Sequence, residues 1–457
     1  MAIAEPFTPY RPRPTEVRKG IRHVVSSARK NLLTIFNEES YSADFVATKI
    51  LGRKIYVANR PDLVRHILLK NHKNYEPKSP QMRRALELLL GDGLFISDGP
   101  TWAIRRPLVS PIIHNKNLHL FADTMVETAQ EMVDELTATP EGRSVDMVDI
   151  SARLTATIIC RTVFGRNLPR EDAQKIIDGF AAYQKHIDVV NLPYFLGIDN
   201  GLPVFRGFAL RRATNAVRGT ISKIIEDVSQ RHSEGDDRSM IHMLLDARTP
   251  DGEPLTRDAI VNEAATLFMA GYETTATTLA WAHYLLSADA ASEARLHAEL
   301  ETVLGNRQPT LEDVPKLTFA RAVIDETLRL YPPVPFLLRQ AVSDDQIEDI
   351  SIPAKSLVGV VPWLLHRNPE LWDQPDAFVP DRFVGKSATP FSYIPFAMGP
   401  RICAGVSFGI TESVLCLAVF ARHLQFRVAQ GHNVEPVCHL TLKPGGGLPM
   451  TVERRQT

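Results

Sequence analysis

The chain is poor in cysteine, has no long apolar run and carries almost no net charge. Its four cysteines, at positions 160, 403, 416 and 438 of 457 residues, are too few and too scattered for a disulfide framework. No CxxC pair occurs, so neither a zinc site nor an iron–sulfur cluster is supported, and a reducing cytoplasmic location is expected. The near balance of 52 Lys+Arg and 53 Asp+Glu gives no general attraction for nucleic acid. Because no segment of 18 apolar residues exists, no transmembrane helix is expected.

Internal repeats, low-complexity tracts and a clear interdomain linker are also missing from the sequence. Length alone would suggest two or three domains, but nothing divides the chain, and a hydrophobic content of 44% supports one large interior. We therefore expect a mainly α protein with small β-sheets. Residues 1–457 would form one large helical domain, with a small β-rich lobe near 40–75 and 335–365.

Hydrophobic periodicity and helix-breaking residues place the elements along the chain. The longest helical pattern covers 256–288, and three more helices follow before the prolines at 332, 333 and 335. The other expected elements are a hairpin over 46–58, helices over 59–70, 101–109, 118–136, 147–164, 171–185 and 209–232, a loop with a short helix over 77–90, and a charged linker over 234–238. The apolar loop 187–208 is too long for a simple connector. The basic amphipathic stretch 17–36 suits a membrane surface, although a solvated helix that caps the fold is favoured.

Cys403 lies in a loop whose composition suits a bound ligand. The stretch Phe396-Ala397-Met398-Gly399-Pro400-Arg401-Ile402-Cys403-Ala404-Gly405 precedes an apolar helical run over 410–419. A thiolate at the start of a helix benefits from the helix dipole and from free N–H groups. We expect Gly399 and Gly405 to adopt positive φ and to admit a flat ligand, and Arg401 to hold an acidic group of it. A buried cysteine without a ligand has the same spacing.

This decapeptide resembles the cysteine loop of the cytochromes P450, F-x-x-G-x-R-x-C-x-G, at all five fixed positions. The resemblance implies the cytochrome P450 fold, a haem b cofactor and Cys403 as the thiolate ligand of the iron, with Phe396 and Arg401 as further haem-binding residues. The other three cysteines match no motif of the family and are expected to be ordinary thiols.

The longest expected helix contains Ala270-Gly271-Tyr272-Glu273-Thr274-Thr275. The Thr274 hydroxyl can bond the carbonyl of Ala270, four residues back, which bends a helix and opens a groove among small side chains. A helix that merely packs closely on another would have the same composition. The hexapeptide resembles the oxygen-binding motif of the cytochromes P450, [AG]-G-x-[DE]-T-[TS]. The resemblance implies that Ala270 and Gly271 face the haem and that Glu273 and Thr274 are catalytic.

The next motif, Glu326-Thr327-Leu328-Arg329, places an acid and a base on one helix face, where they can form an ion pair. A surface salt bridge would have the same spacing, but apolar neighbours favour a buried pair. The motif resembles the family's E-x-x-R, and Pro380-Asp381-Arg382-Phe383 resembles its P-E-R-F with Asp in place of Glu. The resemblance implies a structural triad of Glu326, Arg329 and Arg382 that fixes the approach to the cysteine loop.

Three further residues are assigned to the haem propionates by resemblance. Trp102 and Arg106 match the family's W-x-x-x-R helix, and Arg339 matches the arginine that follows E-x-x-R. Together with Arg401, they would supply three guanidinium groups for two carboxylates, a task that suits the planar and permanently charged arginine. Each residue taken alone also fits a surface position.

The resemblance implies a monooxygenase that inserts one atom of O2 into a hydrophobic substrate, with electrons from a ferredoxin and its reductase. A monomer with no nucleic-acid partner is expected. By family position, the pocket is lined by 82–95, 187–208, Ala270, 334–337 and 446–448, whose aliphatic character suggests a fatty-acid-like, terpenoid or steroid substrate. Arg83 and Arg84 could anchor a carboxylate, although a solvated helix face is favoured. A peroxide-driven or rearranging P450 and a non-catalytic haem-thiolate protein are the alternatives, and the Glu273–Thr274 pair argues against all of them.

Overall fold

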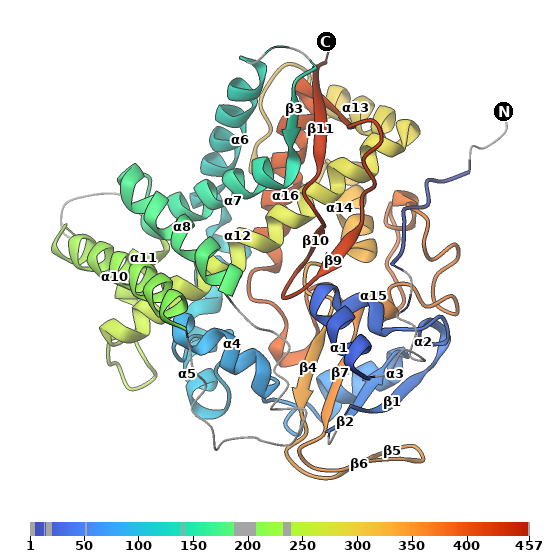
Figure 1. Ribbon diagram of the computed structural model, residues 1–457. Coiled ribbons are helices and arrows are strands. Elements are labelled where there is room, and N and C mark those ends of the chain that lie inside the picture. Colours follow the sequence, from blue (N-terminus) through green and yellow to red (C-terminus); the bar gives the residue numbers. More distant parts are fainter. Residues whose placement is uncertain are drawn as a thin grey trace.

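The structure is a computed structural model that describes residues 5–12, 14, 21–50, 53–138, 140, 142–186, 207–231 and 239–455. Helices make up most of the described chain (Figure 1). The α-helices are α1 (Ile21–Lys30), α2 (Glu39–Ser42), α3 (Pro61–Arg65), α4 (Pro80–Leu90), α5 (Gly99–Val109), α6 (Ala122–Thr137), α7 (Met147–Phe164), α8 (Arg170–His186), α10 (Phe208–Arg231), α11 (Met240–Asp246), α12 (Arg257–Ala288), α13 (Ala290–Leu304), α14 (Thr318–Leu330), α15 (Pro362–Leu365) and α16 (Val406–His423). The 3₁₀ helices are η2 (Leu32–Ile35), η4 (Ser110–Ile113), η5 (Asn115–Leu120), η6 (Leu311–Asp313), η7 (Pro380–Arg382) and η8 (Gly399–Arg401), and η3 (His66–Lys70) is a π-helix.

The strands form small sheets at the periphery of the helical body. They are β1 (Phe45–Ile50), β2 (Arg53–Ala58), β3 (Ser144–Asp146), β4 (Leu337–Gln340), β5 (Asp345–Ile347), β6 (Ile350–Ile352), β7 (Leu357–Val360), β8 (Leu424–Val428), β9 (Pro436–Cys438), β10 (Leu442–Pro444) and β11 (Pro449–Arg454). The largest sheet has the order β1-β2-β7-β4, in which β2 and β7 are parallel; the others are β3-β11-β8, β10-β9 and β5-β6. The expected fold class, mainly α with small β-sheets, is confirmed.

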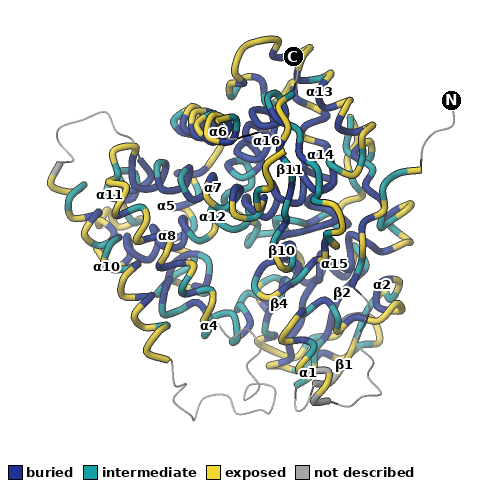
Figure 2. The backbone as a smooth tube through the Cα atoms, turned by 45° about the horizontal axis from the view of Figure 1, so that its top comes forward, coloured by how far each residue is buried: buried dark blue, intermediate teal, exposed yellow. Residues whose placement is uncertain are grey.

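Helix α12 crosses the molecule and packs against α7, α10, α14 and α16. It begins where the Thr256 hydroxyl accepts a hydrogen bond from the Ala259 amide (3.2 Å). Figure 2 shows α16 and much of α12 buried, whereas outer helices such as α10 expose one side. A helix buried on nearly all sides must be apolar all round, which explains why α12 and α16 show weak amphipathic patterns.

Helix α16 is the one helix in the described part of the chain that is long and apolar enough to cross a membrane. In the structure, 72% of that stretch is buried within the protein, among α6, α12, α13 and α14. Its apolar character is therefore accounted for by its place in the core.

One local prediction is right only in part and another is wrong, and each difference has a structural cause. Residues 80–90 form a complete helix, because Ser79 caps its N-terminus by accepting from the Met82 amide (3.4 Å) and Pro80 suits the first turn. The expected helix over 17–36 is interrupted at Asn31, whose side chain bonds the Pro436 carbonyl (2.9 Å) and the Cys438 amide (3.1 Å). The expected loop over 187–208, apart from its last two residues, and the expected linker over 234–238 lie outside the described residues.

Candidate functional site

A large cavity of about 280 Å³ lies between α12 and the cysteine loop. All ten residues that the sequence assigned to catalysis or to the haem line it: Trp102, Arg106, Ala270, Gly271, Glu273, Thr274, Arg339, Phe396, Arg401 and Cys403. They come from α5, α12, β4 and the cysteine loop, segments that are far apart in the sequence.

The cysteine loop is a tight structure pressed against η3. Gly399 has φ +72, and a Cβ there would lie 2.0 Å from the Leu68 carbonyl oxygen, so only glycine fits. The Cys403 amide donates to the Phe396 carbonyl (2.9 Å), which closes the loop. The prediction of positive φ at Gly405 is wrong, because its φ is −94. A Cβ at Gly405 would lie 3.9 Å from the Cys403 Sγ, so this glycine leaves space beside the sulfur.

Cys403 is exposed to the cavity, although protein surrounds it on its other sides. Burial raises the pKa of its thiol. A hydrogen bond from the Gly405 amide and the charges of Arg106 and Lys78 oppose this shift of the pKa. The loop therefore supplies the N–H group and the positive charge that a thiolate needs.

Four cations converge on the same cavity: Lys78, Arg106, Arg339 and Arg401. Burial lowers the pKa of all four groups. Repulsion by neighbouring arginines lowers the pKa of Lys78, Arg339 and Arg401 further, and the pKa of Arg339 and of Arg401 falls to about 10. Within the described residues, the ion pair found for this cluster is Arg401 with Glu76 (3.5 Å). Buried cations need anionic partners. A group with two carboxylates, such as haem, would neutralise the excess charge, so the residues present fit that cofactor.

Lys78 was not predicted. It stands over the Phe95 ring at 4.5 Å and forms an isolated β-bridge with Arg339. Both contacts depend on the tertiary fold, and Lys78 belongs to no motif that would have revealed it. By contrast, Trp102 and Arg401 were both predicted, and their contact (4.3 Å from guanidinium to ring) brings two of the assigned groups together.

On α12, the Thr274 hydroxyl donates to the Ala270 carbonyl (2.6 Å), as predicted. The Glu273 carboxylate accepts from Gln184 (2.7 Å) and lies 4.0 Å from the Lys443 ammonium. Burial raises the pKa of Glu273, while Lys443, Thr441 and Gln184 lower it by a smaller amount. A carboxyl with a raised pKa beside a hydroxyl is suited to holding and passing a proton.

Gly271 has both roles that its motif allows, since it faces the cavity and also permits close packing of two helices. It lines the cavity, and on its other side a Cβ would lie 2.6 Å from the Ile159 Cδ1 of α7. The Thr155 hydroxyl of α7 also donates to the Tyr272 carbonyl (2.8 Å). Close packing of α7 on α12 therefore requires a small residue here, whatever the cavity contains.

The three residues of the expected structural triad are in contact. Arg329 and Glu326, both fully buried, are joined by two hydrogen bonds of 2.7 Å, and the Arg382 Nε lies 3.4 Å from the Glu326 Oε1. The Arg329 guanidinium donates further to the carbonyls of His366, Pro375 and Ala377 (2.6–2.8 Å). With these five hydrogen bonds, Arg329 has the partners that burial of a charge demands.

The triad is connected to the cysteine loop through His366, which the sequence did not indicate. Its Nε2 accepts from the Ile394 amide (2.9 Å), so its Nδ1 carries the proton and donates to the Arg329 carbonyl (3.2 Å). Burial lowers the pKa of His366 to about 3, which keeps it neutral. Ile394 in turn accepts from the Ala397 amide (3.0 Å), inside the loop.

The predicted pocket lining is right for 82–95, Ala270 and 334–337 and wrong for 446–448, and most of the predicted segment 187–208 lies outside the described residues. Met82, Leu94, Phe95, Val334 and Leu337 line the cavity. Residues 446–448 do not, because Gly447 and Leu448 pack against Asp146, which accepts from the Leu448 amide (2.9 Å). Leu440 and Thr441 take their place. Arg83 is paired with Asp98 (2.9 Å).

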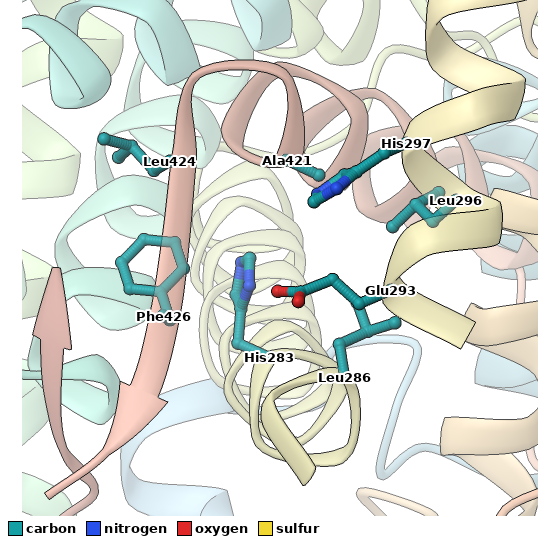
Figure 3. Close-up of a pocket in the computed structure, with 8 residues that line it drawn as sticks. All are labelled: His283, Leu286, Glu293, Leu296, His297, Ala421, Leu424 and Phe426. Carbon is teal, nitrogen blue, oxygen red and sulfur yellow. The ribbon is translucent and has the colours of Figure 1, made fainter. Parts of the chain in front are cut away.

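A second cavity, between α12, α13, α16 and β8, shares no residue with the first (Figure 3). It has space for about one water molecule, roughly 10 Å³. His283, Glu293 and His297 border it, but Glu293 already binds Arg427 through two bonds (2.6 and 2.7 Å), and burial lowers the pKa of His283 to about 4. Among the described residues, no group of His, Cys, Asp or Glu has the arrangement of a metal site.

Comparison with known proteins agrees with this geometry. The sequence profile of the family "Cytochrome P450" matches residues 23–449. Cyclooctatin synthase of Streptomyces melanosporofaciens is 31% identical over 434 residues, which cover 93% of this chain and 91% of that protein. Carotene epsilon-monooxygenase of Arabidopsis thaliana is 27% identical, over 88% of this chain and 78% of that protein. The crystal structure of the cytochrome P450DA heme domain has a TM-score of 0.78 at 24% identity and covers 90% of this chain and 89% of its own. The chain therefore belongs to the cytochrome P450 family of haem-thiolate monooxygenases.

Proposed function

We propose that the whole chain acts as one haem domain that oxidises a hydrophobic substrate with O2. The observation that carries this proposal is the convergence of Cys403, four cations and an apolar wall on one cavity. Cys403 would ligate the iron of haem b through Sγ. Arg106, Arg339, Arg401 and Lys78, with Trp102, would hold the propionates. When bound, the haem activates O2, so that one oxygen atom enters the substrate and the other leaves as water.

The roles of the surrounding residues follow from their contacts. The Thr274 hydroxyl donates a hydrogen bond to the Ala270 carbonyl, so the hydroxyl oxygen is free to accept a hydrogen bond in the cavity. Glu273 holds a proton more readily than an exposed glutamate because burial raises its pKa. The pair would deliver protons to the oxygen-binding side of the cavity. Glu326, Arg329 and Arg382 would support the cysteine loop.

The substrate that fits best is an isoprenoid, with a fatty-acid-like or steroid compound as the alternative. Apart from the cations and the Glu273–Thr274 pair, the wall is mainly aliphatic, and one relative is named for carotene, an isoprenoid hydrocarbon. A ferredoxin with its reductase would supply the electrons to a monomeric enzyme in the cytoplasm. A spin-state titration of the holoprotein with isoprenoids, a long-chain fatty acid and a steroid would identify the class.

The reduced CO-difference spectrum tests the thiolate assignment. We expect the red-shifted Soret band from the wild type and from Cys160→Ala, a matched change of a buried cysteine away from the cavity. Cys403→Ala should lose the band. Survival of the band in Cys403→Ala would refute the assignment.

A further inference from the structure

Residues 91–97, which connect α4 to α5, form part of the cavity wall; we call them the wall loop. Its Leu94 and Phe95 line the cavity. Its Ser97 carbonyl accepts from the Arg401 guanidinium (2.7 Å). The position of the wall loop therefore affects both the space for a ligand and one of the cations.

Helix α12 holds the wall loop through buried polar groups. The fully buried Glu263 carboxylate accepts from the Leu94 amide (3.0 and 3.1 Å) and from Arg105 (2.7 Å). The Asn262 Nδ2 donates to Asp92 (2.7 Å). A Cβ at Gly91 would lie 2.3 Å from the Asn262 side chain. The loop backbone is thus in direct contact with α12 and cannot shift without breaking these bonds.

Helix α10 joins the same network through Arg218. Its Nη1 donates to the Asn262 Oδ1 (2.8 Å) and to the Leu89 carbonyl (2.9 Å), which lies in the last turn of α4. Asn262 therefore bonds α10 with its oxygen and the wall loop with its nitrogen. Because a charge-assisted hydrogen bond is worth more than a neutral one, Arg218 ties α10 firmly to the end of α4.

We propose that Arg218, Asn262 and Asp92 form a latch that couples α10 to the wall loop and sets how fast ligands enter and leave the cavity. The three are positioning residues, since none of them lines the cavity. Movement of α10 away from α12 removes the Arg218 bonds, which leaves the Asn262 Oδ1 and the Leu89 carbonyl with one partner fewer. Asn262 then holds Asp92 less firmly, and the wall loop is free to move outward. The latch depends on the proposed function in one respect: the cavity must contain the haem that the ligand reaches.

The test uses the holoenzyme and 4-phenylimidazole, an aromatic ligand whose nitrogen binds haem iron. Arg218→Gln should raise both the association and the dissociation rate of the probe, measured by stopped flow, by about tenfold. Amide hydrogen exchange in 91–97 should accelerate by a similar factor. The matched control is Arg212→Gln, an exposed arginine on the same helix, which should match the wild type.

A double change separates the latch from a general loosening. If Arg218 and Asn262 act through their shared bond, Arg218→Gln combined with Asn262→Ala should accelerate the probe no more than the larger single effect. Equal exchange and equal probe kinetics in Arg218→Gln and Arg212→Gln would overturn the latch. If the two single effects on the probe rates added up in the double variant, Arg218 and Asn262 would act independently, and the proposed coupling through their shared bond would be wrong. The reduced CO-difference spectrum, recorded on each variant, tests the haem assignment separately from the latch.

Discussion

Glu412 offers a quantitative test of the structure, because it is a carboxyl with no exposed surface and no hydrogen-bond partner for either oxygen. It lies on α16, which packs against α12, with the Thr275 hydroxyl nearby. Burial raises the pKa of Glu412 from 4.5 to about 8, and Thr275 offsets only part of this shift. Glu412→Gln replaces the carboxyl with a neutral group of the same shape.

The sign of the pH effect follows from proton linkage. The folded state keeps a proton on Glu412 that the unfolded chain, with its ordinary pKa near 4.5, releases. Between pH 4.5 and 8 the folded state therefore binds more protons, and the free energy of unfolding falls as pH rises, by about 1.4 kcal/mol per pH unit. Glutamine does not titrate. The free energy of unfolding of Glu412→Gln, taken relative to that of the wild type, should therefore rise by roughly 4 kcal/mol from pH 5 to pH 8.

Urea unfolding of the holoprotein, followed by far-UV circular dichroism at half-unit steps from pH 5 to 8, measures this difference. A constant cost of burying the amide shifts the whole difference curve but not its slope. Glu301→Gln, an exposed glutamate on α13, is the control, and its curve should run parallel to that of the wild type. A pH-independent difference between Glu412→Gln and the wild type would refute the assignment of a buried, protonated carboxyl.

Three further predictions address the site and its support. Thr274→Ala should cut NAD(P)H-coupled product formation by at least about tenfold and divert electrons to peroxide; unchanged coupling would contradict a role in proton delivery. Arg329→Met should cost about 3–5 kcal/mol and lower the haem content, whereas Arg321→Met, which breaks a half-exposed pair on the same helix, should cost under about 1 kcal/mol; equal losses in unfolding free energy would contradict burial of the pair. Gly271→Ala should destabilise by about 1–3 kcal/mol through contact with Ile159 Cδ1, and adding Ile159→Val, which lacks that atom, should restore stability; no restoration would show that another contact is responsible.

Elements with strong local signals were predicted closely. The expected helix over 147–164 matches α7, which starts where Asp146 accepts from the Val148 amide (2.9 Å). The expected helix over 256–288 differs from α12 by one residue. Elements fixed by distant partners were not. The break at Asn31 depends on bonds to a segment about 400 residues away, which periodicity cannot register.

The same distinction applies to the site. Cys403, Glu326 and Arg329 lie in motifs that can be recognised from the sequence alone. Lys78 and His366 belong to no such motif. Their roles follow from contacts in the folded protein, which are the β-bridge of Lys78 to β4 and the hydrogen bond of His366 to the Ile394 amide. A lysine and a histidine in unremarkable sequence are more often solvated than functional, so only the fold could single them out.

The cation cluster connects the stability of the protein to its cofactor. Arg339 is 3% exposed, and its pKa is lowered both by burial and by the charge of Arg401. Such repulsion opposes folding, and the core must offset it as long as no anionic partner is bound. A cofactor with two carboxylates reverses the sign of this contribution, because each cation then gains a partner in a medium where charges interact strongly. Since a ligand that binds only the folded state stabilises it, haem would complete the electrostatics of the fold as well as supply its chemistry.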